Sequence, residues 1–176
     1  MMLQVAELKR RTGSQRKTRW QEPIENFDLK DTDFKLLAPI QAKVQVTNVG
    51  DRMLVEGEAV AKLLTTCCRC LIEFEQELII DLEETFLFVS KVFSEEEGDE
   101  ENEDRYLPVL MADQIDLTEL LKESFFSQLP IKAVCKEECL GLCETCGKDL
   151  NEGPCDCQEE AVDPRFAILS QWKKKE

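Results

Sequence analysis

The sequence contains no histidine, and this absence excludes several kinds of chemistry at once. Its 176 residues include 9 Cys but 0 His. Without an imidazole the chain cannot carry Ser-His-Asp or Cys-His catalysis, an HExxH zinc site or a histidine proton shuttle. Any zinc site must therefore be made of thiolate ligands, with a carboxylate or a water as the only possible additional ligand.

Basic charge and long apolar runs are also scarce. There are 22 Lys and Arg residues against 37 Asp and Glu residues, which gives a net charge of −15 and a pI near 4.5. A protein that wraps a nucleic acid needs a basic surface, so only a local contact with phosphate remains open. No run approaches the roughly 18 apolar residues of a membrane span, and no signal peptide opens the chain. We therefore expect a soluble protein with no membrane partner.

Charge is unevenly distributed and marks the expected domain boundaries. Residues 1–20 form a basic segment with six Lys or Arg residues and one Glu, whereas residues 95–104 contain eight acidic residues and no basic one. A block of like charge this dense is typically solvated, so we predict an acidic disordered loop over 94–105. This loop separates an antiparallel β region over 21–93 from a helical region over 106–134 and a cysteine-rich tail over 135–176.

Residues 21–93 show the alternation of half-buried strands. Apolar residues alternate with polar ones over 42–46, a turn signal follows at 48–51, and a second strand is predicted over 54–64. Apolar even positions over 74–88 indicate one face of a long third strand, which we expect to bend or bulge near Glu83 and Glu84. The pattern predicts an antiparallel meander with one packed face and one solvated face.

The apolar period changes to that of helices in the second half. Asp116 followed by Glu119 forms a capping-box signal, and apolar residues recur at helical spacing from Leu117 to Phe125. A last helix is predicted from Asp163, because an N-cap residue followed by Pro is typical of a helix start. The predicted fold class is therefore α+β: an antiparallel β meander with a few helices and a cysteine-rich, zinc-stabilised C-terminal tail.

The nine cysteines gather in two segments. The first is Cys67-Cys68-Arg69-Cys70 at a predicted hairpin turn, and the second runs from Cys135 to Cys157 and holds six cysteines. A Cys-x-x-Cys pair in a tight turn directs two sulfurs to one ion. The second segment is interrupted by glycines and a proline and cannot build a hydrophobic core alone. A structural zinc site would supply about 10 kcal/mol or more of folding free energy, so we predict Zn²⁺ as the cofactor.

Eight of the thiols divide into two sets of four. Spacing favours a compact set within the tail and a second set that joins the two halves of the chain, with Cys68 left over. The predicted metal ligands are Cys143, Cys146, Cys155 and Cys157 in the compact set, and Cys67, Cys70, Cys135 and Cys139 in the other set. Between them the sets would hold one or two ions.

Two other interpretations of the thiols compete with metal binding. The cysteines over 67–70 could simply be buried small hydrophobes at the end of a strand. Alternatively, a Cys-x-x-Cys pair could be redox-active. Thioredoxin-like chemistry places its motif at a helix N-terminus after a parallel strand, and neither motif here has that context, so redox catalysis is disfavoured.

Two strings of residues resemble one known family. Cys67, Arg69, Cys70 and Leu71 resemble the mid-chain signature of the YceD-type proteins, which are associated with accumulation of large-subunit ribosomal RNA. The string CLGLCETCGKDLNEGPCDC over 139–157, followed by DPRFAIL over 163–169, resembles the tail of the cysteine-rich members of that family. The resemblance runs in order from about residue 20 to residue 172.

The resemblance implies a bacterial or plastid protein that serves maturation or accumulation of large-subunit ribosomal RNA without enzymatic activity, and it favours the bacterial cytoplasm over the plastid as its location. The partners it implies are pre-ribosomal RNA or a large-subunit assembly intermediate. Through the gene neighbourhood of the family, it also implies a small ribosomal protein of the large subunit. No catalytic residue and no small-molecule substrate are expected.

Two functional hypotheses follow from the charge pattern. The first is an accessory factor in ribosome biogenesis that touches RNA through the basic segment 1–20 and the cluster Lys173–Lys175. The other interpretation of these clusters is a pair of solvated, mobile termini. The second hypothesis is an acidic zinc-binding adaptor or chaperone that masks a basic ribosomal protein. Trp20 is expected to pack on the β region rather than to stack on a base.

Overall fold

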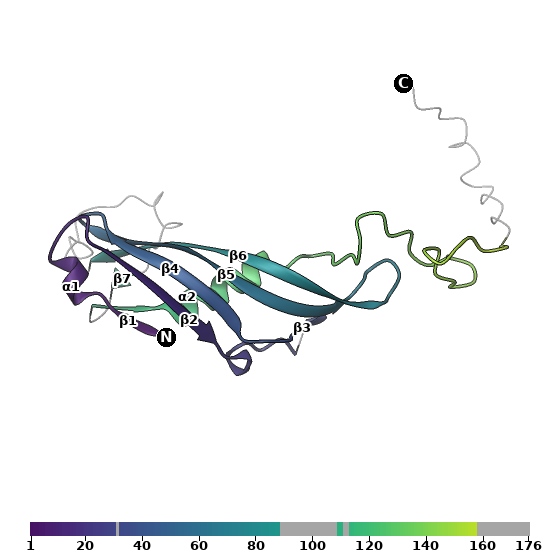
Figure 1. The fold of residues 1–176 in the computed structure, drawn as a ribbon, viewed down its shortest axis with the longest axis horizontal. Helices are drawn as coiled ribbons and strands as arrows, with labels where there is room; N and C mark the ends of the chain where they lie inside the picture. The colour runs from purple at the N-terminus through teal and green to yellow at the C-terminus, as the bar shows by residue number, and fades with distance from the viewer. Residues whose placement is uncertain (31, 89–108, 111–112, 158–176) are drawn as a thin grey trace, which may run out of the picture.

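The computed structural model describes residues 1–30, 32–88, 109–110 and 113–157, and these residues form a curved β-sheet with a helix behind it and a tail beyond it (Figure 1). The strands are β1 (Met2–Gln4), β2 (Gln15–Glu22), β3 (Phe34–Leu36), β4 (Ile40–Asn48), β5 (Arg52–Thr66), β6 (Glu73–Phe88), β7 (Val109–Leu110) and β8 (Gln114–Asp116). The helices are α1 (Ala6–Lys9), the short 3₁₀ turn η1 (Ile24–Asn26) and α2 (Leu117–Gln128).

The main sheet has the strand order β2-β4-β5-β6-β7, and β3 adds to β5. Strands β4, β5 and β6 follow one another along the chain and pair antiparallel, which confirms the predicted meander. Strand β7 pairs parallel with the end of β6, and β1 pairs with β8 in a separate two-stranded ribbon. The mostly antiparallel sheet with its helices confirms the α+β class.

The β5–β6 hairpin keeps one register over its whole length. The pairs run from Arg52 opposite Leu87 to Thr66 opposite Glu73 without an inserted residue. The expected bulge near Glu83 and Glu84 is therefore wrong, because both residues have partners in the ladder, Glu56 and Val55. The regular twist of paired strands accommodates this length without an extra residue.

The two faces of the sheet differ as the alternation predicts. Side chains of one parity are buried on β4, β5 and β6, including Val46, Val55 and Ile80, while their neighbours are exposed or half-buried. Helix α2 packs onto this inner face and buries Leu117, Leu121 and Phe125. The Phe125 ring meets the Phe27 ring edge-on, with 5.1 Å between the centroids.

Helix α2 begins as its sequence predicts. The Asp116 carboxylate accepts hydrogen bonds from the backbone N–H groups of Thr118 at 3.0 Å and Glu119 at 3.4 Å, which confirms the N-cap. Near the other end of the helix, the side-chain amide of Gln128 forms two hydrogen bonds with the backbone of Asp81 on β6. It accepts one from the Asp81 N–H at 2.9 Å and donates one to the Asp81 carbonyl at 2.8 Å. This side chain therefore satisfies backbone groups on the outer edge of β6, where a further strand would otherwise bind.

The basic segment 1–20 is part of the fold, so its interpretation as a mobile terminus is wrong. Strand β2 pairs with β4 over eight residues. The Lys9 ammonium lies 2.6 Å from Asp113 and 5.0 Å from the centre of the Phe88 ring. The Arg16 guanidinium donates to the Gln4 carbonyl at 2.9 Å and to Glu7 at 3.2 Å. Local charge density alone did not reveal these long-range partners.

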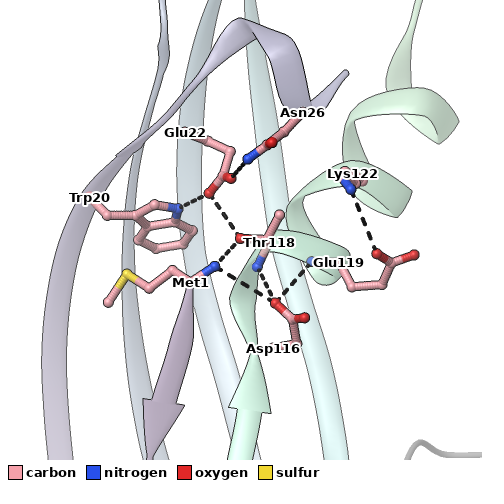
Figure 2. A network of polar contacts seen from close by, with 8 residues as sticks. All are labelled: Met1, Trp20, Glu22, Asn26, Asp116, Thr118, Glu119 and Lys122. Atoms are coloured by element: carbon pink, nitrogen blue, oxygen red, sulfur yellow. Dashed lines mark hydrogen bonds and ion pairs between the residues drawn. The ribbon is translucent and has the colours of Figure 1, made fainter. Parts of the chain in front are cut away.

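Glu22, at the end of β2, joins three elements through one buried carboxylate (Figure 2). It accepts hydrogen bonds from Trp20 Nε1 at 2.9 Å, Thr118 Oγ1 at 3.0 Å and the Asn26 side-chain amide. The Thr118 hydroxyl in turn accepts a bond from the Met1 amino group. Trp20 packs against the core as expected, and its indole N–H is satisfied within the protein.

Several predicted features lie outside the described residues: the acidic loop over 94–105, the helix from Asp163 and the cluster Lys173–Lys175. Within the predicted helical region 106–134, the structure also contains the strands β7 and β8. No helix in the described part of the chain is both long enough and apolar enough to cross a membrane.

Replacing Glu22 with Ala should lower the free energy of unfolding by about 3 kcal/mol, because three donors in a buried site lose their acceptor. Urea unfolding followed by circular dichroism would measure this. Glu25→Ala is the matched control: Glu25 is exposed on η1, and its removal should change the free energy of unfolding by less than about 0.5 kcal/mol. Equal midpoints for the two variants would contradict the role given to Glu22.

Candidate metal centre

The tip of the β5–β6 hairpin is a tight turn that presents two sulfurs. The Cys67 N–H donates to the Ile72 carbonyl at 2.9 Å, and the Leu71 N–H donates to the Cys67 carbonyl at 3.0 Å. Leu71 adopts a left-handed conformation, with φ of 60°. The Cys67 and Cys70 side chains are buried, whereas Cys68 points into solvent. The sequence Cys-x-x-Cys therefore places its two outer thiols on the same side of the turn.

A second turn with the same hydrogen bonds lies in the tail. The Cys143 N–H donates to the Lys148 carbonyl at 2.8 Å, and the Gly147 N–H donates to the Cys143 carbonyl at 2.9 Å. Gly147 takes the left-handed position, with φ of 72°, where Leu71 stands in the first turn. The Cys-x-x-Cys spacing, rather than the surrounding fold, thus determines the local geometry at both places.

The first cluster of thiols joins the hairpin to the tail. The sulfurs of Cys67, Cys70, Cys135 and Cys139 all lie within 4.8 Å of one another. Cys67 and Cys139 are 3.8 Å apart, and Cys70 and Cys135 are 3.6 Å apart. Four sulfurs bound tetrahedrally at zinc–sulfur distances of 2.3 Å would be separated by about 3.8 Å. The first cluster therefore has a donor set and a spacing that could hold a metal ion.

The second cluster lies wholly within the tail and is more exposed. It consists of Cys143, Cys146, Cys155 and Cys157, whose sulfurs also lie within 4.8 Å of one another. A short antiparallel bridge between Leu142 and Asp149 brings the two sides of its loop together. Cys143 and Cys155 approach to 3.3 Å. This cluster, too, could hold a metal ion.

Hydrogen bonds favour the thiolate form at cysteines of both clusters. Burial raises the pKa of Cys67, but backbone N–H groups of Cys135, Cys70 and Arg69 outweigh it and lower that pKa to about 6. Backbone N–H groups of Cys146 and Thr145 lower the pKa of Cys143 to about 6. Since the thiolate is the metal-binding form, these N–H groups prepare both sites for a cation.

Other thiols in the clusters resist deprotonation by themselves. Burial and the neighbouring Cys70 thiol raise the pKa of Cys135 to about 12. The hydrogen bond to Cys146, followed by burial, raises the pKa of Cys157 to about 12. A cation that binds all four sulfurs must therefore displace protons, which couples metal binding to pH.

Two side chains other than the cysteines, Arg69 and Asn151, stabilise the clusters. The Arg69 guanidinium donates to the backbone carbonyls of Cys139 at 2.9 Å and Glu137 at 3.2 Å, and these hydrogen bonds attach the tail to the hairpin tip. The Asn151 amide, from the loop of the second cluster, contacts the Cys139 sulfur of the first at 3.4 Å. Only the Cys-x-Arg-Cys motif signalled Arg69, and nothing in the sequence signalled Asn151.

A close approach of backbones completes the contact between hairpin and tail. The Leu142 N–H donates to the Arg69 carbonyl at 3.2 Å, and the Cys68 N–H donates to the Ala133 carbonyl at 2.9 Å. Gly141 has a φ of 76°, and a Cβ there would lie 3.1 Å from the Arg69 carbonyl oxygen. A side chain at Gly141 would therefore push the tail away from the hairpin.

The structure brings the eight candidate ligands together in the two sets that spacing favours. Cys68 belongs to neither set. The sequence pattern alone gave the composition of each set, whereas the contact between the sets through Asn151 depends on the folded tail.

Fold and site together define an α+β protein with two four-cysteine clusters, one of them shared between a β-hairpin and a tail. Comparison with known families agrees with the resemblance in the sequence. The family described as "Large ribosomal RNA subunit accumulation protein YceD" matches residues 55–173, which is more than half of the chain. The chain therefore belongs to this family, whose name links it to accumulation of the large ribosomal RNA subunit.

Several proteins are similar to this chain. An uncharacterised protein of Mycobacterium tuberculosis is 28% identical over 181 residues, which cover 96% of this chain and 79% of the relative. An uncharacterised protein of Bacillus subtilis, YlbN, is 23% identical over 168 residues, or 89% and 93% of the two chains. The Arabidopsis thaliana "Large ribosomal RNA subunit accumulation protein YCED homolog 1, chloroplastic" is 29% identical over 62 residues, or 35% and 19%. No solved structure gave a significant match.

Replacing Arg69 with Gln should lower the metal affinity of the first cluster about tenfold and leave that of the second cluster unchanged. The reason is that the two tail carbonyls lose the side chain that donates hydrogen bonds to them. Titration with a chelator, with the released metal followed by an indicator dye, would resolve the two sites. Arg10→Gln removes the same charge from an exposed position away from the clusters and serves as the control. Identical release curves for Arg69→Gln and the wild-type protein would contradict this role.

Proposed function

We propose that this chain is a non-enzymatic accessory factor in the maturation or accumulation of large-subunit ribosomal RNA. Family membership, over residues 55–173, is the observation that carries the proposal. The partner on this proposal is pre-ribosomal RNA or an assembly intermediate of the large subunit, in the bacterial cytoplasm. A binding role is also consistent with the commitment of eight of the nine cysteines to two clusters rather than to a reactive thiol.

We also propose that the two clusters bind one Zn²⁺ ion each. Four-sulfur donor sets with tetrahedral spacing are typical of structural zinc, and structural sites of this kind have no open coordination position for a substrate. Cys67, Cys70, Cys135 and Cys139 would hold the first ion, and Cys143, Cys146, Cys155 and Cys157 the second. The ion in the first site would fix the tail to the hairpin tip, so both halves of the protein would face a partner in one arrangement.

An acidic adaptor for a basic ribosomal protein is the second candidate function. One observation favours it: the outer face of β6 carries acidic side chains in alternate positions, among them Glu75, Glu77 and Asp81. A cationic protein tail would be attracted to such a row. The two functions differ in their primary partner, which is RNA in the first and protein in the second.

Cells lacking this protein should contain less large-subunit than small-subunit ribosomal RNA, and a gene copy carrying both Cys67→Ser and Cys70→Ser should not restore the ratio. The double substitution removes half of the ligands that fix the tail to the hairpin. Cys68→Ser is the matched control, because Cys68 lies in the same turn but in neither cluster. It should restore the ratio fully, as measured by quantifying both RNAs.

An unchanged ratio in cells that lack the protein would overturn the proposed function. Failure of Cys68→Ser to restore the ratio would show that the turn, rather than the metal cluster, is what the cell requires.

A further inference from the structure

A groove crosses the outer, solvated face of the sheet over β2, β4 and β5. It consists of two hollows of about 480 and 500 Å³ that share Arg19 and Lys43 in their linings. The second hollow adds Lys17. The linings also include Gln21, Gln41 and Gln45, whose side-chain amides can donate hydrogen bonds.

The charge of this groove is opposite to that of the protein. Its side chains include three cations and two carboxylates, Glu56 and Glu58, so the lining carries a net charge of +1, whereas the whole chain carries −15. One carboxylate, Glu58, pairs with Lys43 at 2.8 Å. An anion near this face is therefore attracted to the groove, although the net charge of the molecule repels it.

Two of the cations stand directly opposite each other on neighbouring strands. The register of β2 and β4 pairs Arg19 with Lys43, and Lys17 lies two residues along the same face of β2. Like charges at opposing positions of an antiparallel pair destabilise the sheet. The ion pair of Lys43 with Glu58 offsets part of this repulsion, and an anion bound between Arg19 and Lys43 would offset more of it.

The fold distinguishes these cations from Lys9 and Arg16 of the segment 1–20. Lys9 and Arg16 are held by Asp113 and Glu7 within the protein. Lys17 and Arg19, in contrast, form no ion pair with any residue that the structure describes, and both are exposed. The basic segment therefore contains two kinds of cations, one structural and one available to a ligand.

We propose that this groove binds the phosphodiester backbone of RNA, with Lys17, Arg19 and Lys43 as the phosphate contacts. The inference rests on the proposed role in ribosomal RNA accumulation and identifies the face that would touch the RNA. The only aromatic residue in the lining is Trp20, whose ring packs on the core and bonds Glu22. Bases have no ring to stack on in the groove, so recognition is by phosphate and is independent of sequence.

Binding of a fluorescein-labelled oligouridylate to the full-length, metal-loaded protein would test this proposal. A variant with Lys17→Gln, Arg19→Gln and Lys43→Gln should bind about tenfold more weakly at moderate salt, and the slope of log affinity against log salt should fall by about 2, since each phosphate contact on a single strand contributes about 0.7. The matched control is Lys30→Gln, Lys35→Gln and Lys62→Gln, which removes the same charge from exposed positions outside the groove. It should bind as the wild-type protein does.

Equal loss of affinity in both triple variants would overturn the proposal, because net charge and not the groove would then control binding. The proposal would also be overturned if the groove variant bound oligouridylate as tightly as the wild-type protein does. A wild-type protein that binds no oligouridylate but co-purifies with a basic ribosomal protein would also overturn it, in favour of the adaptor. The melting temperature of the groove variant should not fall, which verifies that it folds.

The experiments test the groove proposal and the proposed function separately. If cells lacking the protein lose large-subunit RNA but the groove variant restores it and still binds RNA, the function stands and the groove assignment fails. If the RNA ratio does not change in those cells, the function fails, while weaker binding by the groove variant still supports the groove.

Discussion

The uninterrupted pairing of β5 with β6 is the constraint on which the other parts of this molecule depend. Its register runs from Arg52 opposite Leu87 to Thr66 opposite Glu73, so the hairpin projects its tip far from the core that α2 covers. That tip is the Cys67–Cys70 turn. A slip of one residue in this register would turn every side chain of one strand to the opposite face. It would thereby disrupt the buried core and change the direction of the two thiols.

The tail has little apolar material with which to hold itself in place. Around the first cluster, the buried residues are the cysteines themselves, with Phe74, Val134 and Leu142 packed partly against them. Backbone bonds such as Leu142 to Arg69 join tail and hairpin, but bonds of this kind contribute only about 1 kcal/mol each. A structural metal site contributes about 10 kcal/mol or more, so on this account metal binding decides whether the tail docks.

Local patterns in the sequence predicted the local structure, and long-range contacts escaped them. Alternation predicted the meander, Asp116 predicted the start of α2, and cysteine spacing predicted how the thiols group. The pairing of β2 with β4 was missed because a strand rich in Lys and Arg resembles a solvated segment until its partner is known. The buried bonds of Glu22 and the contact of Asn151 with Cys139 were missed for the same reason, since their partners lie far along the chain or in another loop.

The distribution of charge gives the two faces of the molecule different roles. The inner face is apolar and carries the fold, while the outer face has cations along β2 and β4 and carboxylates along β6. A basic groove on an acidic protein would favour an approach to RNA with this face forward, because the net charge of the molecule repels phosphate. With the tail fixed to the hairpin tip, the position of the second cluster relative to that groove would also be fixed.

Metal content per chain is the most direct test of this account. Protein purified without chelator should contain two equivalents of zinc, and Cys67→Ser should contain one, because the second cluster has all its ligands within the tail. Less than half an equivalent in the wild-type protein, with the thiols oxidised to disulfides, would contradict the account.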